Sequence, residues 1–127
     1  GECETLKIQE SAENYLESIL ILQKQKGHVR SIDIVNYLDF SKPSVSVAMK
    51  NLRENGFIHM EDGFITLTEK GLEIAQTMYE RHTVLSHWLI SLGVDEKIAV
   101  EDACRMEHTM SPESFTAIKT FITQNQN

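Results

Sequence analysis

The chain has 127 residues and a mass of 14.5 kDa, enough for one well-buried core or for two small helical lobes that share a helix. Its 41% apolar and 24% charged residues exclude a disordered chain and a fibrous repeat. The longest aliphatic run, residues 19–22, is far too short for a membrane span, and the N-terminus lacks the regions of a signal peptide. We therefore expect a cytoplasmic protein that contacts no membrane.

Positive charge is concentrated in one part of the chain. The formal net charge of −7 argues by itself against a nucleic-acid partner. Residues 24–53, however, contain six lysines and arginines against two aspartates, a net charge of +4. The segments on both sides of this basic block carry a net negative charge. Whether the protein can bind nucleic acid therefore depends on the structural elements that residues 24–53 form.

Three helices are predicted in the first half of the chain. An N-cap serine, acidic residues and apolar side chains at helical spacing predict a helix over residues 11–26. A second, short helix follows over residues 31–38. Pro43, which is favoured in a first helical turn, opens a third helix that runs to Asn55 and ends before Gly56.

A two-stranded hairpin is predicted next. Residues 57–60 and 64–67 flank Glu61-Asp62-Gly63, in which Asp-Gly is a strong hairpin signal. Three helices followed by a hairpin is the order of a winged helix, and the basic block coincides with its second and third helices. We therefore expect a winged helix-turn-helix that binds double-stranded DNA.

The third helix presents the candidate DNA-binding residues. Its exposed positions combine cations suited to phosphate, small hydroxyl side chains and Val47, which is suited to a thymine methyl group. The alternative is that these positions are the solvated face of a structural helix. The predicted DNA-binding residues are Ser41, Lys42, Pro43, Ser44, Ser46, Val47, Lys50, Asn51 and Arg53.

The second half of the chain is predicted to be entirely helical. A long helix opens at Thr68 and continues to Leu92, with apolar side chains at three- and four-residue spacing along a seam that faces another helix. A fifth helix, capped by Asp95, runs to His108. A sixth opens at Ser111-Pro112. The fold class is therefore mainly α: a winged helix-turn-helix followed by a helical domain.

Cys104, Glu107 and His108 form a distinctive group in the fifth predicted helix. In a helix they stand at i, i+3 and i+4, so their side chains leave one face within a single turn. A thiolate, a carboxylate and an imidazole suit a divalent transition metal better than Mg²⁺ or Ca²⁺. The same spacing is also compatible with a buried Cys, a solvated Glu and a surface His on an ordinary amphipathic helix.

The chain resembles the diphtheria toxin repressor family of metal-dependent transcriptional regulators, including its two-domain branch, the manganese transport regulators. The resemblance covers residues 8–124. It is carried by these motifs: Glu13-Asn14-Tyr15-Leu16-Glu17, Pro43-Ser44-Val45-Ser46, Leu67-Thr68-Glu69-Lys70-Gly71, Arg81-His82, Leu92-Gly93-Val94-Asp95, and Asp102-Ala103-Cys104-Arg105-Met106-Glu107-His108-Thr109-Met110-Ser111. It implies a DNA-binding domain over residues 1–71 and a metal-binding, dimerising domain over residues 72–127.

The resemblance also implies a set of metal ligands. These are Asn14, Glu17, His82, Cys104, Glu107 and His108. Family members usually have Asp or Met where this chain has Asn14, and Asn14 can ligate only through its carbonyl oxygen. The implied function is a homodimeric repressor of metal-homeostasis genes that binds its operator when Fe²⁺ or Mn²⁺ is present. Cys104 favours Fe²⁺, and in vitro also Zn²⁺ or Ni²⁺, whereas Glu17 and the two-domain length favour Mn²⁺; we lean slightly to Fe²⁺.

Two other functions fit parts of the sequence. A small metalloenzyme would need an open coordination position and a general base in a cleft, and no acid–base set is recognisable, so we expect neither catalysis nor a small organic substrate. A metal-independent winged-helix regulator, or a protein-interaction module with a vestigial metal site, is the second alternative. In that case metal would not change the thermal stability of the protein.

Overall fold

The structure is a computed structural model that describes residues 2–125, with side chains described from Glu10 onward. The chain divides into two compact units, one up to Thr77 and one from Met78 onward. The elements in chain order are α1 (Glu2–Lys26), α2 (Ser31–Leu38), α3 (Lys42–Glu54), β1 (Ile58–Glu61), β2 (Phe64–Leu67), α4 (Glu69–Ser91), α5 (Glu96–Met106) and α6 (Pro112–Gln124). The boundary between the units falls within α4. This order confirms the predicted fold class.

Helix α1 begins earlier than predicted. The expected N-cap at Ser11 is wrong, because the helix starts at Glu2 and passes through Ser11 without a break. Residues 2–10 contain neither Gly nor Pro, and most of them are good helix formers, so nothing in this segment stops the helix before it reaches Ser11. The C-terminal end agrees with the prediction: Gly27 follows Lys26 with a positive φ of 83°.

The caps of α2 and α3 follow from local chemistry. At α2 the Asp33 carboxylate accepts a hydrogen bond from the Arg30 N–H at 2.9 Å and pairs with Lys26. The hydrogen bond from Lys26 and the one from the Arg30 backbone hold the pKa of Asp33 below its usual value. At α3 the Ser41 hydroxyl oxygen accepts from the Ser44 N–H at 3.2 Å, and Pro43 occupies the first turn, as predicted.

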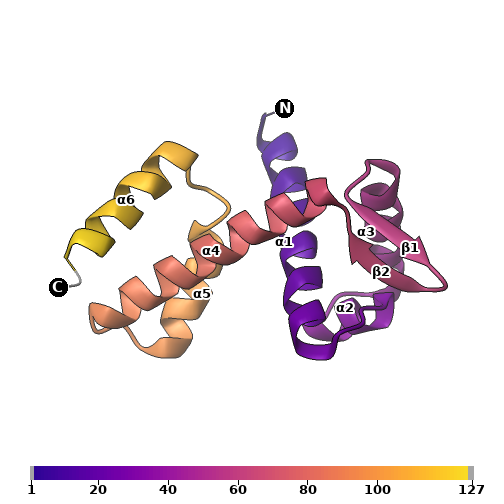
Figure 1. Ribbon diagram of the computed structural model, residues 1–127, viewed down its shortest axis with the longest axis horizontal. Helices are drawn as coiled ribbons and strands as arrows, with labels where there is room; N and C mark the ends of the chain where they lie inside the picture. The colour runs from indigo at the N-terminus through magenta and orange to yellow at the C-terminus, as the bar shows by residue number, and fades with distance from the viewer. Residues whose placement is uncertain (1, 126–127) are drawn as a thin grey trace. The chain divides into compact units, whose positions relative to one another are not determined.

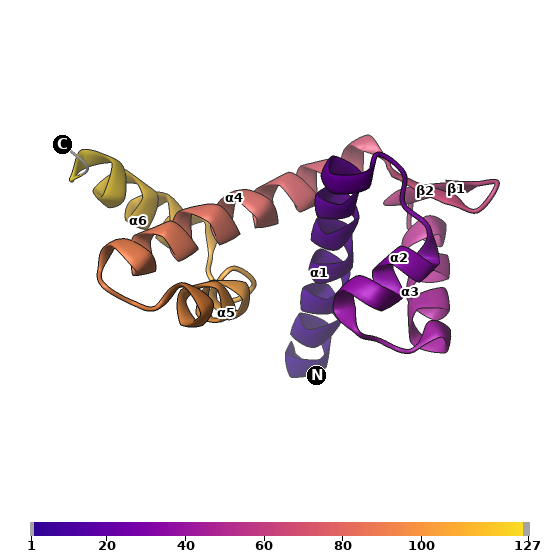
Figure 2. The ribbon, with the colours of Figure 1, turned by 90° about the horizontal axis from the view of Figure 1, so that it is seen from below.

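The hairpin turn lies at Asp62-Gly63, as predicted, while Glu61 belongs to β1 and not to the connection. Ile58 pairs with Leu67 and Glu61 with Phe64 in an antiparallel register, and both turn residues, Asp62 and Gly63, have positive φ of 54° and 82°. That conformation matches the right-handed twist of the strands. The hairpin is also attached to the α1–α2 connection, because the Ile65 N–H donates to the Val29 carbonyl at 2.8 Å. The hairpin therefore has a fixed place beside α3 (Figure 2).

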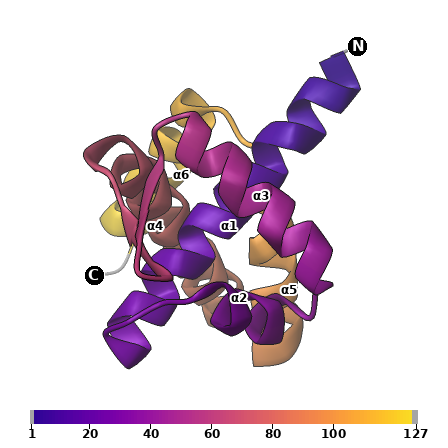
Figure 3. The same cartoon turned by 90° about the vertical axis from the view of Figure 1, so that its right-hand side faces the viewer.

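The core of the first unit is built around α1, which lies against α2 and α3 (Figure 1 and Figure 3). Most apolar side chains at helical spacing in the three helices are buried together with one residue from each strand, whereas Ile32 of α2, which was expected to face inward, is 43% exposed. The most deeply buried members are Leu16, Ile19, Ile34, Val45, Met49, Ile58 and Ile65. The third helix is therefore held by its inner face, and its outer face is left exposed.

The start of α4 is tied to the end of α3. The Thr68 hydroxyl donates to the Gly56 carbonyl at 2.7 Å and accepts from the Gly71 N–H at 3.1 Å, so one side chain caps α4 and holds the preceding loop. Gly71 is buried against the backbone of Phe57. The motif of residues 67–71 therefore has a packing role in the first unit.

The second unit consists of the rest of α4 with α5 and α6 packed on it (Figure 1). Its core is small, with Leu85, Ala103 and Phe115 at the centre. Helix α5 ends at Met106, and not at His108 as predicted; Glu107 is its C-cap residue. Helix α6 begins with Ser111 as N-cap and Pro112 in its first turn, as predicted. No helix within residues 2–125 combines the length and the apolar character that a membrane crossing needs.

Candidate metal centre and DNA-binding surface

The Glu107 carboxylate lies between two imidazole rings in the second unit. Its side chain is 0% exposed, with His82 Nδ1 at 3.4 Å from one carboxylate oxygen and His108 Nε2 at 3.3 Å from the other. Within residues 2–125, neither oxygen of Glu107 receives a hydrogen bond. A buried carboxylate without such bonds is costly unless a positive charge compensates it. The three side chains therefore form an electron-rich cluster suited to a cation.

The middle of α4 and the C-terminal end of α5 bring this cluster together. His82 comes from the middle of α4, Glu107 is the C-cap of α5, and His108 follows in the α5–α6 connection. The Arg81 guanidinium, next to His82 in α4, donates from Nη1 to the carbonyl oxygens of Glu107 and Met110 at 3.0 and 2.6 Å. Arg81 thus binds the carbonyl of the α5 C-cap residue and the carbonyl of the residue before the α6 N-cap.

The other predicted ligands have different surroundings. Cys104 is exposed on α5, whereas Glu107 is buried, so the two side chains do not share one environment as the helical spacing predicted. Asn14 and Glu17 belong to α1 in the first unit; Asn14 is partly buried and Glu17 is only 5% exposed. The second unit by itself therefore brings together His82, Glu107 and His108 of the predicted set.

The residues present fit a divalent transition metal. Imidazole nitrogens and a carboxylate oxygen are ligands that Fe²⁺, Mn²⁺ and Zn²⁺ all accept. The Glu107 carboxylate has no hydrogen-bond partner among the described residues. A divalent ion would supply the positive charge that compensates its burial. The donor set alone does not select one ion from this group.

The exposed face of α3 has a cationic flank on the side of the hairpin. Ser46, Lys50 and Arg53 line a hollow of about 280 Å³ together with Ser31 at the start of α2 and Met60 of β1. Two positive charges and two hydroxyl groups therefore surround one concavity. This arrangement suits a phosphate group of a nucleic-acid backbone.

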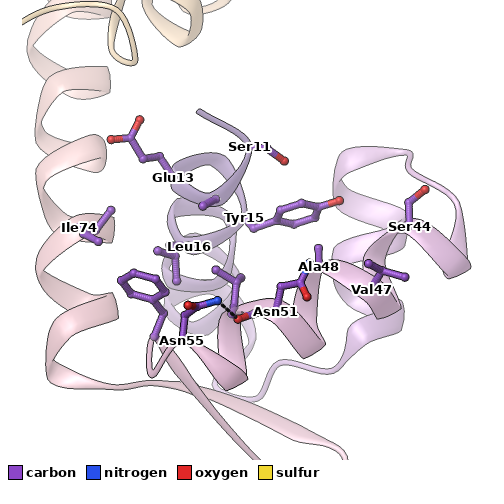
Figure 4. A pocket seen from close by; sticks show the side chains of 13 residues that line it. Ser11, Glu13, Tyr15, Leu16, Ser44, Val47, Ala48, Asn51, Asn55 and Ile74 are labelled. Carbon is purple, nitrogen blue, oxygen red and sulfur yellow. Dashed lines mark hydrogen bonds between the residues drawn. The ribbon is translucent and has the colours of Figure 1, made fainter. Parts of the chain in front are cut away.

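The opposite flank of α3 faces α1 and is neutral. Ser44, Val47 and Asn51 line this side of a pocket of about 780 Å³, with Tyr15 of α1 across from them (Figure 4). The Tyr15 phenol, whose pKa burial raises further above its usual value, is a neutral hydroxyl near neutral pH, as tyrosine side chains ordinarily are. This flank offers small and neutral groups, which suit contacts to base edges better than contacts to phosphate.

The first turn of α3 is exposed but partly occupied by capping. Lys42 and Pro43 are exposed. The Ser41 hydroxyl donates to the Ser44 hydroxyl at 2.8 Å while its oxygen accepts from the Ser44 N–H. The two serines therefore have a structural role that the sequence analysis did not separate from DNA binding.

Comparison with protein families gives two matches that together span nearly the whole chain. Residues 7–63 match the model described as "Iron dependent repressor, N-terminal DNA binding domain". Residues 68–127 match "Iron dependent repressor, metal binding and dimerisation domain". The first match contains α2, α3 and the turn of the hairpin, and the second contains the His82, Glu107 and His108 cluster.

Individual relatives agree with these matches. The chain is 34% identical over 116 residues to the HTH-type transcriptional regulator MJ0568 of Methanocaldococcus jannaschii, covering 89% of this chain and 93% of the relative. It is 36% identical over 117 residues to the transcriptional regulator MntR of Salmonella typhimurium, covering 91% and 74%.

A solved structure described as a manganese-dependent transcriptional repressor in complex with manganese is similar with a TM-score of 0.80 and 25% identity. The match covers 91% of this chain and 54% of that one, so the chain spans about half the length of the solved structure. The family matches and the relatives confirm the resemblance found in the sequence motifs: this chain belongs to the iron-dependent repressor family of metal-dependent, DNA-binding transcriptional regulators, the family of the diphtheria toxin repressor and the manganese transport regulators.

Proposed function

We propose that this chain, as a metal-dependent repressor of metal-homeostasis genes, senses Fe²⁺ or Mn²⁺ through a centre built on His82, Glu107 and His108. The observation that carries the proposal is the Glu107 carboxylate, fully buried between two imidazole nitrogens and without a hydrogen bond among the described residues. Such a group is costly to keep in a fold. Retaining it is understandable if a cation is bound there.

The remaining ligands in the proposal are Asn14, Glu17 and Cys104. They are supported by the family motifs in which they stand. Bound there, the ion would supply the positive charge that the carboxylates of Glu17 and Glu107 need. Because Glu17 belongs to the first unit and Glu107 to the second, shared ligation would tie α1 to the helices of the second unit.

The proposed partners are double-stranded operator DNA and a second copy of the chain. The matched domains are described as DNA-binding and dimerisation domains. In a symmetric dimer the two α3 helices must reach major grooves about 34–36 Å apart. Tying α1 to the second unit would fix the separation of the two α3 helices, and this would change operator affinity. A 100-fold change in that affinity requires only about 2.7 kcal/mol of coupling. We propose neither catalysis nor an organic substrate for this protein. We propose that it acts in the cytoplasm, where its operator DNA is located.

Exposed apolar side chains support a dimer contact in the second unit. Leu92, directly after α4, is 64% exposed, and Ile98 of α5 is 51% exposed. Ile90 and Val100, in the same short stretch, are exposed as well. Several exposed apolar side chains in one short stretch are typical of a surface that another chain covers.

The metal proposal is tested by fluorescence anisotropy with an operator-like DNA at fixed salt. Mn²⁺, and then Fe²⁺ without oxygen, is titrated into metal-free protein, and the order of the midpoints indicates the preferred ion. His82→Gln is expected to lose metal-stimulated binding. His87→Gln, which changes an exposed histidine of the same helix, is expected to keep it. Wild-type metal stimulation in His82→Gln would contradict the proposed centre, and metal-independent binding by the wild type would favour a winged helix with a vestigial site.

The cationic flank of α3 gives a separate prediction for DNA binding. Lys50→Ala is expected to weaken binding to all sequences, because Lys50 is exposed in the hollow beside Arg53 and a phosphate contact carries no sequence information. The slope of log K against log salt should become shallower by about one. Lys97→Ala, an exposed lysine of α5, is the control. An unchanged slope in Lys50→Ala would remove Lys50 from the interface.

A further inference from the structure

We propose that Arg81 is a positioning residue that sets the affinity and the ion preference of the metal centre. The inference rests on the proposed function of His82, Glu107 and His108, and it concerns a residue that ligates nothing itself. Arg81 would act by holding the short segment of chain on which Glu107 and His108 stand.

The contacts of Arg81 bracket this segment. Its Nη1 donates to the carbonyl oxygen of Glu107 at 3.0 Å and to that of Met110 at 2.6 Å. Two of the proposed ligands, Glu107 and His108, therefore lie on a turn whose first and last residues are bound by one guanidinium group. Without these bonds the carbonyls of Glu107 and Met110 would lose their Arg81 donor, and the turn between them would be free to change its conformation.

Arg81 also connects this segment to the third proposed ligand. It precedes His82 directly in α4, so the helix that positions His82 also carries the group that holds Glu107. On its other side the guanidinium lies 5.4 Å from the centre of the Phe115 ring in α6. One side chain thus links the α4 backbone beside His82, the end of α5 and the start of α6.

The burial of Arg81 is too costly for a packing role alone. The residue is 6% exposed, it forms no ion pair with any described residue, and its buried Nε has no hydrogen-bond partner among residues 2–125. A buried cation that is satisfied only by carbonyl oxygens and one ring is expensive. Methionine or leucine would fill the space without this cost. We therefore infer that Arg81 is kept for its hydrogen bonds to the two carbonyl oxygens.

Three roles for Arg81 predict different results for two substitutions. If Arg81 positions the ligands, Arg81→Met lowers Mn²⁺ affinity about 10- to 100-fold, and Arg81→Lys, which keeps a charge and a donor nitrogen, keeps part of the affinity. If Arg81 acted only through its charge, Arg81→Met would bind Mn²⁺ more tightly, because a cation near the site would be gone. If it acted only in packing, thermal stability would fall and Mn²⁺ affinity would not change.

The preference for Mn²⁺ over Zn²⁺ distinguishes a positioning role of Arg81 from a packing role, because loss of packing alone would not change it. Intrinsic affinity favours Zn²⁺ over Mn²⁺ at most sites, so preference for Mn²⁺ depends on a geometry that the protein imposes. Releasing the Glu107 and His108 segment is therefore expected to weaken Mn²⁺ binding more than Zn²⁺ binding. The ratio of the two dissociation constants should change in Arg81→Met and change less in Arg81→Lys.

The test uses the full chain after removal of metal with a chelator. Mn²⁺ affinity is measured from the electron paramagnetic resonance signal of the free ion, Zn²⁺ affinity by competition, and thermal stability without metal by calorimetry. Asp95→Ala is the control: it removes the carboxylate that accepts from the Lys97 N–H at 3.2 Å at the far end of α5, so it lowers stability without touching the ligand segment.

Weaker Mn²⁺ binding and an altered Mn²⁺ to Zn²⁺ ratio in both Arg81 variants, with wild-type values in Asp95→Ala, would support the proposal. Wild-type affinity and ratio in Arg81→Lys and Arg81→Met would overturn it, as would tighter Mn²⁺ binding in Arg81→Met. Should Arg81→Met fail to fold, the affinity and the ratio in Arg81→Lys decide. Failure of the wild type to bind either ion would contradict the proposed function itself, and so is distinguishable from failure of this inference.

Discussion

Glu107→Gln is expected to raise the thermal stability of the metal-free protein and to abolish its stabilisation by metal. The Glu107 carboxylate is fully buried, and no hydrogen bond reaches its oxygens from the described residues. Replacing a buried charge by a neutral group of the same shape removes a desolvation penalty, which we expect to be worth about 1–2 kcal/mol here. A gain in stability on neutralising one residue is typical of a position kept for function.

The same substitution removes a carboxylate ligand from the proposed centre. For the wild type, a free Mn²⁺ concentration of about 100 times the dissociation constant adds about 2.7 kcal/mol to the free energy of unfolding. In Glu107→Gln this increment should disappear, because an amide oxygen is a far weaker ligand than a carboxylate. The two effects have opposite signs, and a general loss of folding cannot produce both.

Calorimetry with chelator and with saturating Mn²⁺ measures both effects. Glu101→Gln is the control, because Glu101 is an exposed acid on α5 and the substitution makes the same change of charge. The control should resemble the wild type in both conditions. A Glu107→Gln protein that melts later with Mn²⁺ than without it would show that Glu107 is not a ligand.

Gly71→Ala is expected to destabilise the first unit by about 3 kcal/mol. Within a helix this substitution normally stabilises, since Ala is favoured over Gly by about 1 kcal/mol. Here the added Cβ would lie 2.0 Å from the carbonyl oxygen of Phe57 and 3.0 Å from its carbonyl carbon. Both are backbone atoms, and Phe57 is held by its neighbours: its N–H donates to the Leu52 carbonyl at 2.9 Å, and its carbonyl accepts from the Thr68 N–H at 3.0 Å.

Relief of this clash requires α4 to move away from the segment between α3 and β1. The Thr68 hydroxyl, which bridges Gly56 and Gly71, would lose at least one of its hydrogen bonds. Urea unfolding at equilibrium measures the change. Gln76→Ala, at an exposed position of the same helix, is the control and should be close to neutral. Stability equal to or above that of the wild type in Gly71→Ala would show that the close approach to Phe57 does not occur.

Several elements could be predicted from the sequence because their signals are local. Asp62-Gly63 can adopt two successive positive φ angles at little cost, so the hairpin turn was predictable from two residues. Ser41 with Pro43 and Ser111 with Pro112 likewise start α3 and α6 by contacts within one turn. The family motifs added His82, which in isolation resembles an ordinary residue of an apolar seam.

Other features could not be predicted because they depend on residues far apart in the chain. Near the end of α5 at Met106, Arg81 binds the carbonyls of Glu107 and Met110, which stand 26 and 29 residues further along the chain. The sequence motif pointed to Arg81-His82 but did not indicate which group Arg81 binds. The start of α1 at Glu2 was missed for a different reason: Ser11 is a good N-cap, but a serine also fits within a helix when the residues before it favour one.

Local signals in the sequence predicted the order of the elements, the basic character of the α3 region and the residue types of the proposed metal centre, because periodicity, caps and turn residues act over a few positions. Which of those residues share an environment depends on the packing of distant segments. The tertiary structure buries Glu107 between His82 and His108, exposes Cys104, and divides the face of α3 into a cationic and a neutral flank. The physical reason is that burial and charge compensation depend on which surfaces pack together, and local spacing along one helix does not contain that information.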